Sequence, residues 1–389
     1  MAKAQEFQFI GKRTKHRINF DMIKNLVIVP LYINKTGPFN FILDTGVSPL
    51  IITDPKIIEG LGLKNLRPTK INGLGKGPEI DALITSELSA SIGKASINNI
   101  PTAILEGDLL GLSNYLGVKI HGLIGYYFFK SFIVSINYPS KTMAFEVKSK
   151  KTRIKGERVP IELINNKPYA NIETVIPGIG ATQNKVIVDN GAGHAISLEM
   201  YNNEPFPAPK ESFEANLGNG LSGPISGKVG RIASLKIGRY VLANVISSFP
   251  VYDDAAAKTF LLNRNGNLGA DLLSRFNITF DYSGNAMYIV KNRNFKLPFE
   301  HDMSGLEIFT DNADNNRFFV VRIEPGSPGE QAGISKNDEI IAVNFMDTKT
   351  MKLDDISRLF RSQDGKTLFL TINRNGQLTF KLIKLKRRI

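Results

Sequence analysis

The chain has 389 residues, of which 42% are hydrophobic and 22% charged, and it contains no cysteine. This length accommodates two or three domains with separate cores, and the absence of cysteine excludes disulfides, thiol nucleophiles and cysteine zinc sites. The formal net charge is +13, but the basic residues are spread along the chain without an aromatic-rich basic face, so we expect no nucleic-acid binding. No apolar run approaches about 18 residues, so we expect no transmembrane segment.

The N-terminal segment, residues 1–24, begins with Ala2-Lys3-Ala4, an Ala-x-Ala pattern of the kind found at signal-peptidase sites. It predicts an exported protein of the periplasm or cell envelope, with the signal peptide removed. The alternative interpretation is a chance alanine-rich start.

An apolar run, Phe41-Ile42-Leu43, ends abruptly in Asp44-Thr45-Gly46. The run predicts a buried strand, and the glycine permits a sharp turn directly after it. The same pattern returns as Val186-Ile187-Val188 followed by Asp189-Asn190-Gly191, 145 residues later. One such turn is a weak signal, because Asp-x-Gly is ordinary turn chemistry. Two at a fixed offset indicate an internal repeat.

Two further landmarks recur in the same order. Glycine-rich Asn72-Gly73-Leu74-Gly75 corresponds to Leu217-Gly218-Asn219-Gly220, and Gly122-Leu123-Ile124-Gly125 corresponds to Gly266-Asn267-Leu268-Gly269, at offsets of 145 and 144. The sequence therefore predicts a duplicated β domain. We place lobe 1 at 25–148, a basic connector at 149–158 and lobe 2 at 159–291.

Duplication gives the two aspartates a chemical meaning. Two lobes related by a pseudo-two-fold axis would place Asp44 and Asp189 opposite each other. Two carboxyl groups that close cannot both ionise, so the pair shares a proton. One carboxylate then takes a proton from a water, while the other carboxyl group donates to the oxygen of the scissile carbonyl.

The repeated order of Asp-Thr-Gly, glycine-rich flap and apolar-apolar-Gly resembles the retropepsin-like aspartic proteases, in their bacterial form with two fused lobes. The resemblance covers residues 25–292 and implies a mostly β fold of two acid-protease lobes with pseudo-two-fold symmetry. It implies an aspartyl peptidase that needs no cofactor or metal, acts on a peptide or protein substrate and works as a monomer. The site residues it implies are the catalytic Asp44 and Asp189; the supporting Thr45, Gly46, Asn190 and Gly191; and the substrate-binding flap residues Gly73, Leu74, Gly75, Gly218, Asn219 and Gly220.

Asn190 departs from the family pattern. The family usually has threonine or serine after each aspartate, and that hydroxyl bonds across to the opposite lobe. An amide can also donate and accept hydrogen bonds, but it is bulkier. An alternative function therefore stays open, in which a weak or inactive pseudo-protease binds peptides without cutting them.

A linker at 292–303 leads to a different pattern in residues 304–389. The order Pro325-Gly326-Ser327-Pro328, Ala332-Gly333-Ile334 and Asp338-Glu339-Ile340 resembles a bacterial PDZ domain, which has an α+β fold. This resemblance implies a peptide groove at Gly305, Leu306, Glu307 and Ile308, where a C-terminal or extended peptide adds a strand and loop amides hold its carboxylate. The alternative is a degenerate PDZ domain that serves as a packing module.

Other classes of site find little support. His16, His121, His194 and His301 have no histidine or carboxylate at a metal-binding spacing, so we expect no metal site and interpret them as structural. The sequence also contains no plausible Gly-x-Ser-x-Gly elbow, so we reject a Ser-His-Asp triad.

Overall fold

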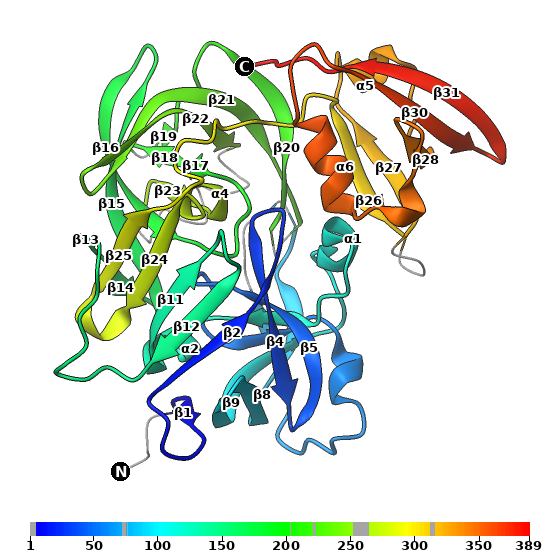
Figure 1. Ribbon diagram of the computed structural model, residues 1–389. Helices are drawn as coiled ribbons and strands as arrows, with labels where there is room; N and C mark the ends of the chain where they lie inside the picture. Colours follow the sequence, from blue (N-terminus) through cyan, green and yellow to red (C-terminus); the bar gives the residue numbers. More distant parts are fainter. Residues whose placement is uncertain are drawn as a thin grey trace. The chain divides into compact units, whose positions relative to one another are not determined.

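A computed structural model describes residues 5–71, 75, 77–202, 204–220, 223–251, 264–311 and 316–389. The chain is mostly β (Figure 1). It forms two compact units. One unit comprises the residues up to Leu110 together with Ile120–Pro298, and the other comprises Gly111–Lys119 together with Phe299–Ile389.

The first lobe is built on one sheet with the order β1-β9-β6-β10-β5-β4-β8-β7, and β3 pairs with β4. Its central strands are the apolar runs of the sequence, which are buried because both faces of the sheet are covered there. The strands are β1 (Gln8–Phe9), β3 (Asp21–Ile23), β4 (Leu26–Ile33), β5 (Thr36–Leu43), β6 (Leu50–Ile52), β7 (Arg67–Ile71), β8 (Ile80–Ile92), β9 (Ala95–Leu105) and β10 (Gly122–Ile124).

The second lobe has a sheet with the order β14-β15-β16-β23-β17-β22-β21-β20. Its strands are β14 (Glu162–Ile164), β15 (Lys167–Ile176), β16 (Gly180–Val188), β17 (Ile196–Leu198), β20 (Ser212–Gly220), β21 (Gly223–Ile237), β22 (Tyr240–Pro250) and β23 (Gly266–Leu268). A short hairpin joins β18 (Met200–Tyr201) to β19 (Glu204–Pro205). The arrangement around the aspartates recurs. β10 lies parallel to β5 and antiparallel to β6, and β23 lies parallel to β16 and antiparallel to β17.

A third sheet takes strands from both lobes, in the order β13-β25-β24-β11-β12-β2. At its centre, Ser135 pairs with Thr279, its counterpart 144 residues later, and their hydroxyl oxygens lie 2.9 Å apart. The strands are β2 (Lys15–Asn19), β11 (Ile133–Asn137), β12 (Thr142–Glu146), β13 (Glu157–Pro160), β24 (Phe276–Asp281) and β25 (Ala286–Lys291). The helical turns of the two lobes are η1 (Pro55–Ile58), α2 (Tyr126–Ser131), α4 (Ala270–Leu273) and η4 (Tyr282–Gly284).

The C-terminal unit has a five-strand path, β26-β27-β28-β30-β31, with β29 paired to β28. Its core is aliphatic and aromatic, and includes Phe318, Ile356 and Phe360. Asn375 and Gly376 both have positive φ and connect paired strands as a two-residue hairpin. The elements are α1 (Leu112–Leu116), β26 (Leu306–Thr310), β27 (Phe318–Ile323), α5 (Pro328–Gln331), β28 (Glu339–Val343), β29 (Met346–Asp347), η5 (Thr348–Thr350), α6 (Leu353–Phe360), β30 (Thr367–Arg374) and β31 (Gln377–Lys384).

The structure divides the chain differently from the sequence in three places. The described part of the predicted N-terminal segment 1–24 is not separate, because β1 pairs with β9 and β2 pairs with β12. Residues 111–119, predicted as part of lobe 1, pack with the C-terminal unit, and the expected linker is divided at Pro298. Within the described residues, no helix combines the length and apolarity needed to cross a membrane.

Candidate active site

Each aspartate follows a buried strand directly. Asp44 comes after β5 and Asp189 after β16, and each backbone N–H donates to the neighbouring parallel strand, to Ile124 O at 2.8 Å and to Leu268 O at 2.9 Å. These two bonds hold the two aspartates at equivalent positions of the repeat. The backbone at each aspartate is therefore held by a hydrogen bond to the neighbouring strand.

The last glycine of each apolar-apolar-Gly motif is required by this packing. A Cβ on Gly125 would lie 2.0 Å from Asp44 O, and one on Gly269 would lie 2.1 Å from His194 O. Real Cβ atoms do not come this close to a backbone oxygen, so only glycine lets the two chain segments approach. The motif is thus a packing requirement of the aspartate turns.

The structure brings the two carboxyl groups together. The side chains of Asp44 and Asp189 lie close enough to interact electrostatically. The glycine of each turn lies against the aspartate of the other turn. A Cβ on Gly46 would lie 3.2 Å from Asp189 Cγ, and one on Gly191 would lie 2.2 Å from Asp44 Cγ. Gly46 and Gly191 therefore make room for the opposing carboxyl group, which is a different role from supplying a turn.

Burial raises the pKa of the Asp44 carboxyl group well above its ordinary value, and the neighbouring charge of Asp189 raises it further. The Gly46 N–H, which donates to Asp44 Oδ1 at 2.6 Å, and the charge of Lys167 act in the opposite direction. Asp189 accepts from Gly191 N at 2.9 Å and from Asn267 Nδ2 at 2.7 Å. The raised pKa keeps a proton on the Asp44 carboxyl group to a higher pH than on an ordinary aspartate.

Thr45 and Asn190 brace the two turns across the lobes. Thr45 Oγ1 donates to Val188 O at 2.6 Å and accepts from Asn190 N at 2.9 Å. Asn190 Nδ2 donates in the other direction, to Leu43 O at 3.0 Å. Each side chain thus reaches the carbonyl that precedes the opposite aspartate. The amide of Asn190 makes the cross-lobe bond that the sequence left in question.

Asn190 has a further partner that the sequence did not indicate. Tyr138 OH donates to Asn190 Oδ1 at 2.6 Å, so the extra oxygen of the amide is satisfied. Tyr282 is the counterpart of Tyr138 in the second copy, and the residue equivalent to Asn190 on its side is Thr45, which has no side-chain carbonyl. The buried hydroxyl of Tyr282 has no hydrogen-bond partner among the described residues. The Tyr138 hydroxyl therefore pairs with the additional side-chain oxygen of Asn190. The equivalent Tyr282 hydroxyl has no such oxygen opposite it, because that position is Thr45.

Asn267 is a site residue that the sequence analysis missed. It is buried in β23, donates to Asp189 Oδ2, and its own Oδ1 lies 3.2 Å from His194 Nε2. The first copy has Leu123 at the equivalent position. A polar residue in an otherwise apolar three-residue strand was the available signal. His194, interpreted as structural, contacts the site through this amide.

Part of the predicted flaps lies outside the described residues, including Gly73 and Leu74. Gly75 is described and buried. In the second copy, Gly218 and Asn219 continue β20 and pair with Ile225 and Pro224 of β21, and Gly220 pairs with Gly223. A Cβ on Gly223 would lie 3.7 Å from Gly77 N, so the two glycine-rich hairpins approach each other.

The predicted PDZ groove residues lie at the start of the C-terminal sheet. Gly305, with φ of +71°, precedes β26, and Leu306, Glu307 and Ile308 form its first three residues. β26 is at the end of the sheet order. Among the described residues, no group of three or more histidines and carboxylates could hold a metal ion. His121 accepts from Asn40 N through Nδ1, so it has a structural partner, as expected.

Comparison with known proteins identifies two domains. A family model described as an aspartyl protease matches residues 29–128, and one described as a PDZ domain matches residues 319–374. A carboxyl-terminal-processing protease of Picosynechococcus sp. is 29% identical over 96 residues, or 24% of this chain and 23% of that protein.

Two solved structures share smaller likenesses. A photosystem II D1 C-terminal processing protease is 24% identical over 25% of this chain and 26% of that chain, with a TM-score of 0.22. A PDZ domain protein from Parabacteroides distasonis is 24% identical over 22% of this chain and 20% of that chain, with a TM-score of 0.20. The chain thus spans about a quarter of the length of these relatives. The family matches show that the chain contains an aspartyl protease domain and a C-terminal PDZ domain.

Proposed function

We propose that the protein is an aspartic endopeptidase in which Asp44 and Asp189 form the catalytic dyad. The observation that carries the proposal is the close approach of the two carboxyl groups, each against the glycine of the opposite turn, with the pKa of Asp44 raised. A protonated acid beside a carboxylate is the arrangement needed to activate water and a peptide carbonyl together. The aspartyl protease match over 29–128 supports this reaction class.

The hydrogen-bond donors around Asp44 and Asp189 support a different role for each carboxyl group. The Asp189 carboxylate, held by the Gly191 N–H and the Asn267 amide, takes a proton from the attacking water. Asp44 donates its proton to the carbonyl oxygen as the water oxygen bonds to the carbonyl carbon. In the second step Asp189 passes its proton to the amide nitrogen, the C–N bond breaks, and Asp44 takes a proton from one hydroxyl of the diol as the carbonyl re-forms in a carboxyl group. The dyad ends the cycle with one shared proton.

An approximate two-fold relation between the lobes is part of the proposal. It accounts for the pairing of Ser135 with Thr279 in the sheet that joins the lobes, and for the reciprocal contacts of Gly46 and Gly191 with the opposing aspartates. Both aspartates come from one chain, so the proposed enzyme acts as a monomer. The approach of Gly77 and Gly223 favours two hairpins that close over an extended peptide.

The PDZ domain is proposed to bind an extended peptide and to orient it for cleavage. A PDZ domain recognises peptides by adding them as a strand at an open sheet edge. In this chain that edge is β26, the first strand of the sheet order.

The experiment that tests the peptidase is cleavage of a diverse peptide pool from about pH 3 to 8, with products identified by mass spectrometry. Asp44→Asn and Asp189→Asn are the matched variants. Cuts that disappear in both variants are the expected result. Cuts that persist in both would contradict the proposed dyad.

The alternative function, peptide binding without cleavage, would give no cuts at any pH. Asn190 was the residue that favoured it, and the bracing hydrogen bonds of its side chain argue against it. An Asn190→Thr variant separates the two explanations. It should cut no better than the parent chain if the amide already braces the dyad.

A further inference from the structure

A peptide that binds this PDZ domain would lie along β26, opposite α6. The two elements run beside each other (Figure 1), and Met303 N donates to Phe360 O at 3.0 Å where the loop before β26 meets the end of α6. A ligand's terminal carboxylate would be held by the amides of this loop, at residues 304–306. The rest of the ligand would extend along β26 toward Thr310.

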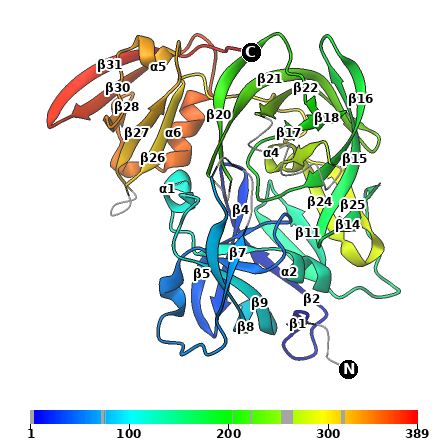
Figure 2. The same ribbon diagram turned by 180° about the vertical axis from the view of Figure 1, so that it is seen from behind.

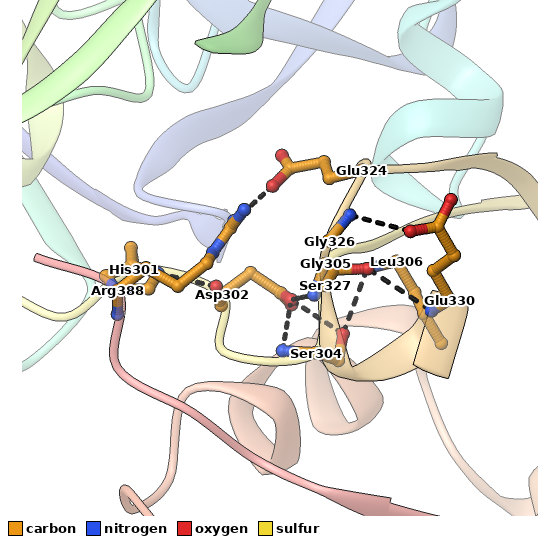
Figure 3. Close-up of polar contacts among 10 residues, drawn as sticks. All are labelled: His301, Asp302, Ser304, Gly305, Leu306, Glu324, Gly326, Ser327, Glu330 and Arg388. Carbon is orange, nitrogen blue, oxygen red and sulfur yellow. Dashed lines mark hydrogen bonds and ion pairs between the residues drawn. The ribbon is translucent and has the colours of Figure 1, made fainter. Parts of the chain in front are cut away.

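The loop amides are already occupied. Asp302 Oδ1 accepts from the backbone N–H groups of Ser304 and Gly305, each at 2.9 Å, and from Ser304 Oγ at 2.6 Å (Figure 3). The next amide, of Leu306, donates to Ser304 Oγ at 3.1 Å. A carboxyl group of the chain itself therefore fills the place in which a ligand's carboxylate would accept hydrogen bonds.

The other end of the groove is occupied by the segment Gly111–Lys119. This segment belongs to the same compact unit as β26, and its helix α1 lies beside β26 in both views (Figure 1 and Figure 2). Thr310 Oγ1 donates to Asn114 O at 3.3 Å, and the Tyr115 and Phe309 rings meet edge to face at 5.9 Å. These contacts cover the C-terminal end of β26, at Phe309 and Thr310.

The segment also reaches the opposite wall. A Cβ on Gly117 would lie 3.0 Å from Leu353 Cβ, at the start of α6, and 3.3 Å from Thr310 Cγ2, so the glycine fits between helix and strand. Burial raises the pKa of the Tyr115 hydroxyl, which is also within electrostatic range of Arg361 and Glu307. Segment Gly111–Lys119 thus contacts both sides of the groove.

We propose that the PDZ groove is filled by the chain itself, with Asp302 in place of a ligand's terminal carboxylate and segment Gly111–Lys119 in place of its upstream residues. An incoming peptide must displace the segment and needs no free C-terminus. The ligand class is therefore an extended internal stretch of polypeptide. This inference rests on the proposed peptide binding by the PDZ domain.

The displaced segment is directly connected, along the chain, to a strand of the aspartyl protease domain. The segment continues through Ile120 and His121 into β10, whose Ile124 carbonyl accepts from the Asp44 N–H. A peptide that displaces the segment therefore releases the stretch of chain that leads into β10, the strand that accepts the hydrogen bond of the Asp44 N–H.

The test uses the full chain with Asp44→Asn, so that no peptide is cut during a binding measurement. The chain contains no tryptophan, so Tyr115→Trp provides a single fluorescent reporter on the segment, and Tyr32→Trp in lobe 1 is its control. The probes are two decapeptides with apolar residues at alternate positions, identical except that one ends in a carboxylate and the other in a carboxamide.

We expect both peptides to bind with equal affinity and to shift the emission of the Tyr115→Trp variant toward that of an exposed indole, while the control variant does not respond. Tyr115→Ala should tighten both peptides about tenfold, because a competing state is removed. Asp302→Ala should favour the carboxylate peptide about tenfold, because a charge-assisted bond is worth roughly that much. Asp302→Asn keeps the acceptor oxygen and should show no preference.

Three results would overturn the proposal. They are a tenfold preference of the parent chain for the carboxylate peptide, peptide binding that leaves the emission of the Tyr115→Trp variant unchanged, and no binding of either peptide by any variant. Failure of the proposed peptidase would be seen separately, as an absence of cuts by the chain that retains Asp44.

Discussion

Asp44 and Asp189 occupy equivalent positions but have different surroundings. The difference arises from one strand residue, because β23 presents Asn267 where β10 has Leu123. The Asn267 amide gives Asp189 a side-chain donor, which a leucine at the equivalent position cannot give Asp44. The asymmetry of the proposed acid and base is thus encoded in one position of the repeat.

Asn267→Leu copies the residue of the first lobe and should lower kcat by about tenfold to a hundredfold, the usual range for loss of one charge-assisted bond. KM should change little, because the lost bond is to a reacting carboxyl group rather than to the substrate. Leu123→Val is the control for repacking of such a strand. An unchanged kcat in Asn267→Leu would contradict the role given to the amide.

The two equivalent tyrosines should respond oppositely to loss of their hydroxyls. Tyr138→Phe leaves the buried Asn190 oxygen unpaired and should cost about 1–3 kcal/mol of unfolding free energy. Tyr282→Phe removes a buried hydroxyl that has no partner among the described residues, so it should be neutral or stabilising. Urea denaturation of both variants measures the difference. Equal destabilisation would show that the Tyr282 hydroxyl is paired in solution.

At the scale of elements, β17 and β23 are fastened by a buried ion pair. Arg264 donates from Nε and Nη2 to both carboxylate oxygens of Glu199, at 2.9 and 3.0 Å, and only 6% and 1% of the two residues is exposed. The Glu199 N–H also donates to Asn265 O at 2.7 Å. This pair fixes the chain just before the strand that carries Asn267.

Arg264→Met leaves the Glu199 carboxylate buried without its cation and should cost about 3–5 kcal/mol of unfolding free energy. The double variant Arg264→Met with Glu199→Leu removes both charges and should recover most of that loss, because two apolar side chains can replace a buried ion pair. Thermal unfolding of the parent and the variants measures both effects. A double variant as unstable as Arg264→Met would show that shape, rather than charge, dominates at this position.

At the scale of the whole molecule, the raised pKa of Asp44 links folding to pH. The native state keeps a proton that the unfolded chain releases. The stability from this group is therefore complete below the unfolded pKa, about 4, and is lost as the pH rises through the higher folded pKa.

We expect the unfolding free energy to fall by up to about 1.4 kcal/mol per pH unit within this window. Asp44→Asn should remove that slope, because an amide does not titrate, and it should be more stable than the parent chain at neutral pH. Asp21→Asn, a change at an exposed aspartate, is the control and should keep the slope. Denaturant titrations at several pH values provide the measurement.

The amino-acid sequence by itself determined what local patterns encode. Apolar runs that end in Asp-x-Gly predicted the strands β5 and β16 and the positions of both aspartates, and the repeat predicted the two lobes. The hairpin at Asn375-Gly376 is equally local, because its geometry depends on two adjacent residues. The strands and turns are each fixed within a few residues of chain, and the repeat is the recurrence of such patterns, so one sequence is enough to recognise them.

Only the tertiary structure decided which side chains support the site and which segments share a unit. Asn190 meets Tyr138 and Leu43 across 52 and 147 residues, and Asn267 meets Asp189 across 78. Segment 111–119 leaves its sequence neighbours to pack on β26. Hydrogen bonds and packing of this kind join positions that no local period relates, so a single sequence predicts the aspartates but cannot predict their partners.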